Sequence, residues 1–344
     1  MDKIDYNLHY NIIYFNTNYE FRGKQNRDEY NAICMRDAET MKDVTIVQGP
    51  MSDSSDFLRK LYFYAHSAKL NRIIKMPEQI WFPLIYRSFP KTNKPFCFVL
   101  ADNGISLKYA GYLRNRFPGC RLVKTHRDLL KWSHLNPEHT EENLNRIFDL
   151  RLAYDPNDAE KYGISHFDEI ESKIDLEISD NYPLSDVFFA GQAKDRLEKI
   201  VEAYDLFTSK GLKCDFVIVH IAPEKRIHRE GIVYLDKFMP YKEMLERSVN
   251  SRCMFDVNQG GAVGYTSRFL EAVMYNKLFI TDNPAVKETK YFKTGNILFF
   301  DKVSEIDPTF ISSKTSVEYN YTGEFSPIHL IKQIDDELTK KFND

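Results

Sequence analysis

The chain has 344 residues, of which 43% are apolar and 14% aromatic. This is enough apolar material for two hydrophobic cores of ordinary domain size, and it argues against a disordered protein. The formal net charge of −3 gives no global reason to expect a nucleic-acid binder.

The cysteines are scattered along the chain, and no two of them form a CxxC pair. An odd, scattered set favours reduced, buried thiols over a disulfide framework. No apolar run approaches the roughly 18 residues that span a bilayer, and the opening residues lack a basic region followed by an apolar core. The sequence therefore predicts a cytoplasmic protein. The five cysteines are Cys34, Cys97, Cys120, Cys214 and Cys253.

The first half of the chain alternates short apolar runs with helical patterns over residues 56–75 and 107–116. Strands that alternate with helices favour a parallel, doubly wound sheet. Such sheets bind ligands at the carboxyl ends of their strands, where the Asp102-Asn103-Gly104 turn follows one strand. The predicted strands are residues 11–15, 44–48, 96–100, 121–125 and 150–154.

The second half repeats this rhythm, with a helix predicted over residues 197–209 and Gly211 as its C-cap. The acidic, polar stretch 168–185, which carries Pro183, is predicted to link two domains, 1–182 and 183–326. Residues 327–344 are predicted to be a C-terminal helix, helical by pattern over 327–342, that packs back on the first domain. The strands expected here are residues 187–190, 214–220, 231–235, 253–257, 278–281 and 297–300.

A phosphate cradle is predicted between the strands 253–257 and 278–281. The first of these strands ends in Asn-Gln-Gly-Gly, and a helix opens near Thr266-Ser267. Gly260 and Gly261 let the backbone approach an anion, and the free N–H groups of the first helical turn can hold it. Arg268 adds a fixed positive charge, and Glu271 can accept hydrogen bonds from the hydroxyls of a ribose.

From about residue 153 to 300 the chain resembles bacterial GT-B glycosyltransferases of lipopolysaccharide and capsular polysaccharide biosynthesis. The resemblance implies two Rossmann-like doubly wound domains that face each other across a cleft. The N-terminal domain would bind the acceptor, and the C-terminal domain a nucleotide-sugar donor. Val263 departs from the pattern, because many retaining members carry a glutamate there; the sugar and the stereochemistry stay open. Three segments carry the likeness: YDPNDAEKYG (154–163), DVFFAGQAKDR (186–196) and NQGGAVGYTSRFLEAVMYNKLFITDN (258–283).

Several donor-binding predictions have plainer alternatives. Lys194 and Arg196 follow Gly191 at a helix start, where cations are electrostatically unfavourable, and we interpret them as a clamp on the donor diphosphate. Arg268 and Glu271 could instead form a surface i,i+3 ion pair. The alternative role of the Thr266 and Ser267 hydroxyls is helix capping, which is compatible with phosphate contact. The nucleotide base is expected near Phe238-Met239-Pro240-Tyr241.

Asp102, Asn103 and His126 end two first-half strands, where an acceptor hydroxyl would lie. A histidine or aspartate there can serve as a general base, and Asp102 and His126 are the candidate catalytic residues. Turn formation explains Asp102-Asn103 equally well, and His126 between charged neighbours is more often a surface histidine. The basic and aromatic stretch 59–75 could contact the inner face of the cytoplasmic membrane, or it is a core helix with a solvated face.

No metal or cofactor is expected, because the sequence has no HExxH motif, no DxD-type pair in the second half and no GxGxxG after a strand. The sequence thus predicts a metal-independent glycosyltransferase. It would transfer a hexose from a nucleotide-sugar to a growing, lipid-linked bacterial surface polysaccharide. The expected partners are the nucleotide-sugar and a glycan or lipid-linked oligosaccharide acceptor, with no nucleic acid; a homo-oligomer is left open. The alternatives are a catalytically silent GT-B subunit that binds a nucleotide or glycan, and an epimerase-like or phosphorylase-like enzyme.

Overall fold

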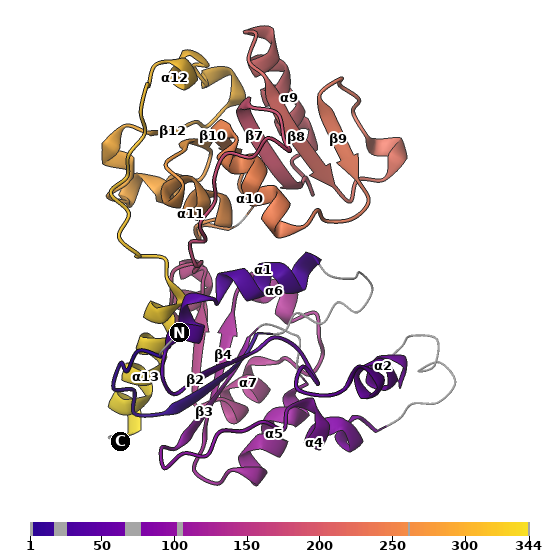
Figure 1. The fold of residues 1–344 in the computed structure, drawn as a ribbon, viewed down its shortest axis with the longest axis vertical. Helices are drawn as coiled ribbons and strands as arrows, with labels where there is room; N and C mark the ends of the chain where they lie inside the picture. Colours follow the sequence, from indigo (N-terminus) through magenta and orange to yellow (C-terminus); the bar gives the residue numbers. More distant parts are fainter. Residues whose placement is uncertain (1–2, 17–25, 66–76, 102–105, 261, 343–344) are drawn as a thin grey trace. The chain divides into compact units, whose positions relative to one another are not determined.

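The computed structural model divides the chain into two compact units (Figure 1). It describes residues 3–16, 26–65, 77–101, 106–260 and 262–342. Unit 1 takes the chain up to Phe167 and from Ser326 onward, apart from residues 25–30. Unit 2 comprises residues 25–30 and Asp168–Phe325.

Unit 1 is built on a six-stranded parallel sheet with the strand order β2-β1-β3-β4-β5-β6. The chain winds outward in both directions from β1, which makes the sheet doubly wound. The strands are β1 (Asn11–Phe15), β2 (Val44–Val47), β3 (Phe96–Ala101), β4 (Arg121–His126), β5 (Leu150–Ala153) and β6 (Ser165–His166). The helices are η1 (Asp37–Thr40), α2 (Asp56–Ala65), η2 (Glu78–Trp81), α4 (Phe82–Ile85), α5 (Leu107–Arg116), α6 (Leu130–Ser133), α7 (Glu141–Ile147), α8 (Pro156–Tyr162) and α13 (Pro327–Phe342). A further helix, α1 (Asn26–Cys34), is divided between the units, because residues 26–30 belong to unit 2.

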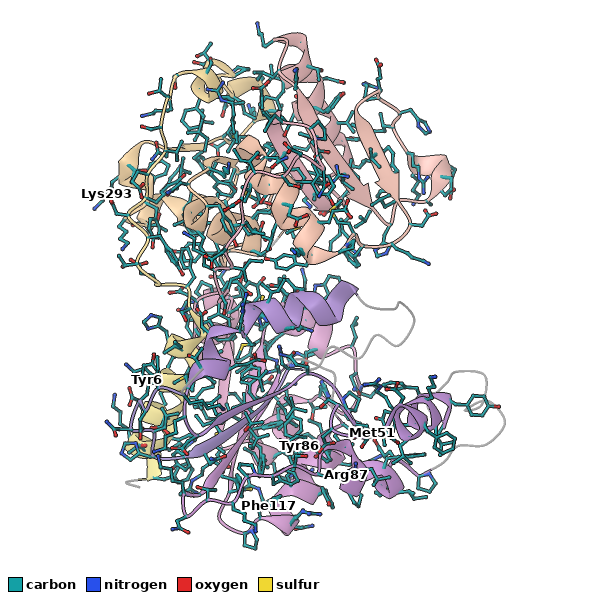
Figure 2. All side chains as sticks on the ribbon, viewed as in Figure 1. Tyr6, Met51, Tyr86, Arg87, Phe117 and Lys293 are labelled. Atoms are coloured by element: carbon teal, nitrogen blue, oxygen red, sulfur yellow. The ribbon has the colours of Figure 1, made fainter. Side chains whose placement is uncertain are left out.

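The core of unit 1 is aromatic on the face of the sheet that α5 and α7 cover. The Phe89 ring packs against those of Tyr86 and Phe117, with ring centroids 4.9 Å and 4.8 Å away. Tyr86 and Phe117 are labelled in Figure 2. The C-terminal helix α13 is tied to β1 by Asp335, whose carboxylate accepts the backbone N–H groups of His9 and Tyr10 at 3.0 Å. This buried carboxylate explains how a segment distant in sequence completes unit 1.

Unit 2 is built on a second parallel sheet with the order β12-β11-β10-β7-β8-β9. From β7 the chain proceeds outward through β8 and β9, and it then returns to β10 on the other side of β7. This is the strand order of a dinucleotide-binding Rossmann sheet. The strands are β7 (Ser185–Gln192), β8 (Cys214–Val219), β9 (Ile232–Leu235), β10 (Ser251–Asp256), β11 (Leu278–Thr281) and β12 (Ile297–Phe299). The helices are α9 (Leu197–Ser209), η3 (Pro223–Lys225), α10 (Tyr241–Val249), α11 (Ser267–Met274), η4 (Pro284–Glu288), η5 (Phe292–Thr294), η6 (Val303–Glu305) and α12 (Thr309–Ser312).

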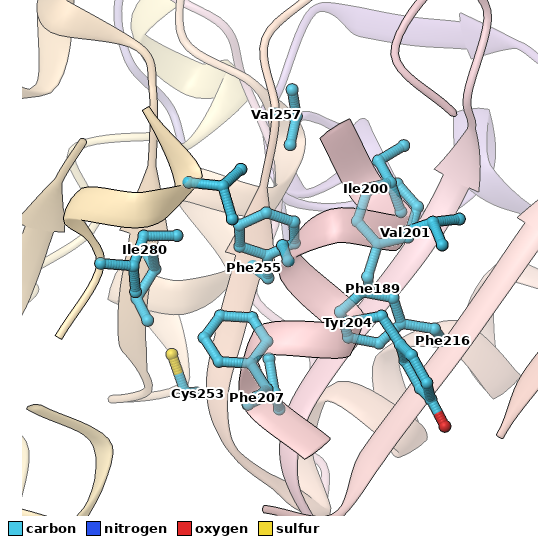
Figure 3. Close-up of a cluster of buried hydrophobic side chains, with 14 of the residues drawn as sticks. Phe189, Ile200, Val201, Tyr204, Phe207, Phe216, Cys253, Phe255, Val257 and Ile280 are labelled. Carbon is cyan, nitrogen blue, oxygen red and sulfur yellow. The ribbon is translucent and has the colours of Figure 1, made fainter. Parts of the chain in front are cut away.

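Phe255 of β10 is the centre of the largest apolar cluster of unit 2 (Figure 3). Its ring lies 5.6 Å from Phe207 of α9, 5.9 Å from Phe216 of β8 and 6.2 Å from Phe189 of β7. Burying one such side chain stabilises a fold by about 1.5–3 kcal/mol. The packing therefore fixes β10 against its neighbours directly before Asp256, the last residue of that strand.

The opposite face of the unit 2 sheet packs on α10 and α11. Met254 and Phe279 contact the apolar side of α11, and Phe188 and Val217 contact Met244 of α10. With α9 on the other face, the sheet has helices on both sides, as a parallel sheet requires.

The predicted fold class is confirmed: each unit is an α/β, doubly wound, Rossmann-like domain. The predicted helices 107–116, 197–209 and 327–342 match α5, α9 and α13, and the strand 278–281 matches β11. Lys210 is the C-cap of α9, and Gly211 follows it with a φ of +77°. The arrangement across a cleft stays a prediction.

The boundary between the units falls at Phe167 and Asp168, whereas the sequence places it at residues 182 and 183. The segment in between has almost no regular secondary structure, but it is bonded to unit 2. The side-chain amide of Asn250 donates to the carbonyl groups of Ser179 and Tyr182, at 2.7 Å and 2.8 Å. These contacts attach the acidic segment to the C-terminal end of α10.

Candidate functional site

The switch point of unit 2 lies between β7 and β10, which are neighbours in the sheet and from which the chain winds in opposite directions. In open parallel sheets, ligands bind outside the carboxyl ends of the strands at such a point. Two loops begin there, residues 193–196 after β7 and residues 257–266 after β10. Most of the predicted donor-binding residues lie on these loops or directly after them.

Arg268 is held at the switch point by a buried carboxylate. Asp256, which is fully buried at the end of β10, accepts Nε of Arg268 at 2.8 Å and the hydroxyl of Thr266 at 2.9 Å. Thr266 is also the N-cap of α11 and accepts the backbone N–H of Phe269. The cation and the helix start are therefore fixed by one acidic residue. Ser267 is the first residue of that helix.

The position of Arg268 requires a residue without a side chain at Gly191. Nη1 of Arg268 donates to the carbonyl oxygen of Ala190 at 3.1 Å. A Cβ atom added at Gly191 would lie 3.1 Å from Nη1, closer than a side-chain carbon normally comes. The glycine thus lets the guanidinium lie against the end of β7. Nη2 of Arg268 has no hydrogen-bond partner within the described ranges.

Arg196 organises the loop after β7. Its guanidinium donates to the backbone carbonyl groups of Ala193 at 3.1 Å, Gln192 at 2.5 Å and Val257. Burial lowers the pKa of Arg196, and the neighbouring charge of Arg268 lowers it further. Arg196 therefore joins the two loops and places a second, partly buried positive charge near Arg268. Its direct contact with a diphosphate stays a prediction.

Lys194 adopts a left-handed backbone conformation, with a φ of +50°. This region is sparsely populated by residues other than glycine, asparagine and aspartate. Nζ of Lys194 donates to the side-chain oxygen of Gln259, on the loop after β10. Lys194 thus places an exposed ammonium group over the second loop.

The loop after β10 is fixed by the residues that follow β11. Asp282 accepts the backbone N–H of Asn258 at 2.6 Å, and Asn283 donates to the carbonyl of Gly264 at 2.9 Å. A Cβ atom at Gly260 would lie 3.4 Å from a carboxylate oxygen of Asp195. Gly261 lies outside the described residues.

Glu271 is placed differently from what the sequence predicts. It is fully buried, and its Oε1 accepts the hydroxyl of Tyr241 at 2.9 Å. It therefore forms no surface ion pair with Arg268, which bonds to Asp256 instead. Its Oε2 has no hydrogen-bond partner among the described residues. In this structure Glu271 offers no exposed oxygen to a ribose.

The Tyr241 hydroxyl also contacts a carboxylate oxygen of Glu171. A phenol has one proton to donate, so two ionised carboxylates cannot both accept from it. Burial raises the pKa of Glu271 to about 7, and the Tyr241 hydrogen bond and the charge of Arg268 oppose that rise. We call Glu171, Tyr241 and Glu271 the buried trio. Because only one carboxylate can accept the Tyr241 proton, the other carboxyl group is the one that most readily takes up a proton of its own.

A hollow of about 320 Å³ lies at the carboxyl ends of β7 and β8. The side chains of Gln192 and His220 meet there at 2.8 Å, and Lys194 and Lys225 also line it. The Phe238 ring packs edge-on against His220, with ring centroids 4.6 Å apart. Phe238 therefore lies beside this hollow, where a nucleotide base could stack.

His126 is not a surface histidine, as its charged neighbours suggested, because its side chain is only 2% exposed. Burial lowers its pKa well below the usual range, and the charges of Lys124 and Arg151 lower it further. Its Nε2 has no hydrogen-bond partner within the described part of the chain. The other acceptor-side candidates, Asp102 and Asn103, lie outside the described residues.

The stretch predicted to contact a membrane is described only in part, as α2. Phe57 and Tyr64 are 74% and 66% exposed there, and Arg59 pairs with Asp56. Lys69, Arg72 and Lys75 lie outside the described residues. Among the helices that are described, none is long and apolar enough to cross a bilayer.

Within the described ranges, no three or more His, Cys, Asp or Glu side chains come together as a metal site. Two carboxylates near the switch point are engaged: Asp256 holds Arg268 and Thr266, and Asp282 pairs with Lys199 at 2.6 Å. A third, Asp195, is exposed on the loop after β7, close to Gly260.

No protein-family model matches the chain, and no curated protein matches it. Among solved structures it is similar to UDP-GlcNAc 2-epimerase of Methanocaldococcus jannaschii, at 16% identity and a TM-score of 0.45, with 96% of this chain and 99% of that chain covered. An alpha-glucosyltransferase in complex with UDP and DNA is similar at 12% identity and a TM-score of 0.45, with 96% and 93% covered. TarM is similar at 9% identity and a TM-score of 0.41, with 72% and 51% covered, so the chain spans about half of TarM. These similarities are too distant to carry an argument about activity.

The site predicted from the sequence lacks Asp256 and Glu171, and it places Tyr241 wrongly. Asp256 carries a readable signal, because an acidic residue that ends an apolar strand before a glycine turn lies at the ligand-binding edge of a parallel sheet. Tyr241 was expected beside a nucleotide base, but it is buried. Nothing in the local sequence indicates that Glu171 comes to lie against it.

Proposed function

We propose that the chain is a nucleotide-sugar-dependent glycosyltransferase whose donor diphosphate binds at the switch point of unit 2. One observation carries the proposal: Arg268 is held by Asp256 against Gly191, at the start of α11 and between the carboxyl ends of β7 and β10. A guanidinium with a free edge, beside a helix N-terminus, matches the geometry and charge of a phosphate.

The arrangement also suits the leaving group of glycosyl transfer. The bond between the sugar C1 and the diphosphate oxygen breaks, and a bond between C1 and the acceptor hydroxyl oxygen forms. The acceptor hydroxyl loses its proton, and negative charge grows on the diphosphate. Arg268, Lys194 and the first turn of α11 are fixed before reaction, so they can stabilise that charge without reorganising. We propose that these groups act in place of a metal ion.

The nucleotide base and the acceptor are proposed to bind at two further places. Phe238 and the hollow beside His220 support a base site next to the diphosphate. The acceptor is proposed to be a growing, lipid-linked bacterial surface glycan that approaches from unit 1. Asp102 remains the candidate general base there, because the His126 side chain is buried. The stereochemistry of the transfer and the transferred hexose stay open.

A second candidate is a catalytically silent module that binds a nucleotide or glycan as a partner subunit. Two observations favour it: Val263 stands in place of a sugar-contacting acid, and Glu271 is buried away from a ligand. Both candidates share the diphosphate site and differ in turnover.

The experiment is a turnover assay with a panel of nucleotide-sugars, with and without a glycan acceptor mixture, in the presence of a metal chelator. The proposal expects release of free nucleotide from at least one donor, increased by acceptor and depressed in an Arg268→Ala variant. Nucleotide binding that is lost in Arg268→Ala, with no turnover of any donor, would support the silent module. If no nucleotide or nucleotide-sugar binds at all, both fail.

A further inference from the structure

A second hollow of unit 2 lies at the amino ends of its strands, opposite the switch point. It has a volume of about 450 Å³ and is lined by the first residues of β7, β10 and β11, which are Ser185, Ser251 and Leu278. The segment 314–317, which follows α12, closes one side. No part of the donor site described above lines it.

Four cations and one carboxylate line this hollow, although the whole chain carries a net charge of −3. None of the four makes an ion pair with a carboxylate within the described residues. The carboxylate, Asp186, accepts the backbone N–H of Lys213 at 2.8 Å. The hollow is therefore strongly positive. Its cations are Lys213, Arg252, Lys277 and Lys314.

One of these cations has a role in the fold. Nζ of Lys277 donates to the carbonyl of Val249 in the last turn of α10, where a positive charge is favourable against the helix dipole. Burial lowers the pKa of Lys277 to about 8. Helix capping accounts for Lys277 and leaves three cations without such a role: Lys213, Arg252 and Lys314. Among the described residues, Arg252 makes one long hydrogen bond, 3.4 Å to the carbonyl of Lys314, and Nζ of Lys314 pairs with no carboxylate.

Ser185 adds an independent observation. Its residue is only 8% exposed, and its hydroxyl has no hydrogen-bond partner among the described residues. Buried hydroxyl groups nearly always have a hydrogen-bond partner, so the unpartnered hydroxyl of this lining residue can donate to a group bound in the hollow. A hydroxyl and an arginine together are typical of a site for an oxyanion.

We propose that this hollow, defined by Ser185, Arg252, Lys277 and Lys314, is a binding site for a phosphate ester. Arg252 would bind two phosphate oxygens, the lysines would supply charge, and the Ser185 hydroxyl would donate to a third oxygen. Two apolar side chains at the rim, Ile178 and Leu184, are 66% and 64% exposed and would contact the group that carries the phosphate. The phosphate ester belongs either to a soluble metabolite or to a phospholipid headgroup.

The test uses the full chain in an Arg268→Ala background, which removes the proposed donor site as a competing anion site. Pyrophosphate binding is measured by calorimetry in Arg268→Ala alone and with Arg252→Gln and Lys314→Gln added. The matched control adds Lys173→Gln and Lys287→Gln, which remove the same charge from exposed positions of unit 2 outside the hollow. Co-sedimentation with vesicles of phosphatidylcholine, alone or with an equal share of phosphatidylglycerol, separates the two sources.

The site predicts that pyrophosphate affinity falls at least about tenfold in the Arg252→Gln, Lys314→Gln variant and stays within about twofold in the control. Because all the substituted side chains are at least partly exposed, the melting temperature without ligand should be unchanged. Co-sedimentation that needs phosphatidylglycerol and is lost only in the hollow variant supports a lipid source. Equal losses in both variants, or no binding of pyrophosphate or vesicles by Arg268→Ala, would overturn the proposal. A failure here leaves nucleotide binding at the switch point untouched, because that is measured with Arg268 present.

Discussion

The carboxyl edges of the two sheets have the same architecture, but they differ in whether a ligand could reach their polar side chains. At the edge of unit 2, Arg268 is held by the buried Asp256 and keeps one edge of its guanidinium unpaired. At the edge of unit 1, Lys124 and His126 are almost fully buried, at 1% and 2% exposure. The carboxyl edge of a doubly wound sheet is where ligands bind. A binding site forms there only if neighbouring residues hold a charged side chain in a position that a ligand can reach.

The largest expected effect is on turnover in Arg268→Ala. If Arg268 stabilises charge that grows on the leaving diphosphate, its loss should lower kcat by about two to three decades. Arg268→Lys keeps the charge but loses the fork of donors that meets Asp256 and Ala190, and it should recover only part of the loss. Steady-state kinetics at saturating donor measures both. If Arg268→Ala keeps the wild-type kcat, Arg268 does not stabilise the transition state, and the edge of unit 2 has no catalytic advantage over that of unit 1.

The next effect concerns the buried trio of Glu171, Tyr241 and Glu271. The folded-state pKa of Glu271 is raised to about 7 from 4.5, so the folded protein holds a proton that the unfolded chain releases. Stability is therefore lost as pH rises from about 4.5 to 7 and is constant above, with a total loss of a few kcal/mol. Glu271→Gln has no such proton and should remove this pH dependence.

Urea unfolding of wild type and Glu271→Gln at several pH values checks this sign. If the free energy of unfolding depends on pH in the same way in both proteins, Glu271 is ionised in the folded protein. The same variant tests the ribose contact predicted from the sequence: a loss of donor affinity of about one to two decades would support it.

A smaller effect is expected from Gly191→Ala. The added methyl group would lie 3.1 Å from Nη1 of Arg268, so the guanidinium must move from its carbonyl partner. We expect a loss of about 1–3 kcal/mol in stability and a fall in donor affinity. Gly211→Ala is a matched control, because a methyl group there meets no atom within 4 Å, although its φ of +77° also disfavours a side chain. Equal effects of the two substitutions on donor affinity would contradict the close approach at Gly191.

The smallest effect is expected from His126→Gln, which tests the other side of the comparison. Loss of a general base lowers rates by about two to four decades. Because the His126 side chain is buried, an acceptor hydroxyl cannot reach it, and we expect turnover within about threefold of wild type. Circular dichroism confirms that the variant is folded. A loss of two decades in a folded His126→Gln protein would place catalysis at the edge of unit 1.

The sequence predicts the elements better than the surroundings of the side chains. Apolar runs place β11 and the helices α5, α9 and α13 correctly, because strands and helices follow local periodicity. Burial is a tertiary property, so Glu271 and His126 look like surface residues in their local sequence and are in fact buried. Glu171 meets Glu271 only through Tyr241, from three separate segments, and no local pattern encodes that meeting.

The central claim is that the switch point of unit 2 binds a nucleoside diphosphate. Calorimetric titration of the wild-type chain with UDP, GDP and ADP in the presence of a metal chelator tests it most directly. At about 100 times its dissociation constant, a bound nucleotide should add roughly 2.7 kcal/mol of stability, and binding should weaken about tenfold or more in Arg268→Ala. No binding by any of these nucleotides, or equal binding by wild type and Arg268→Ala, would contradict the account.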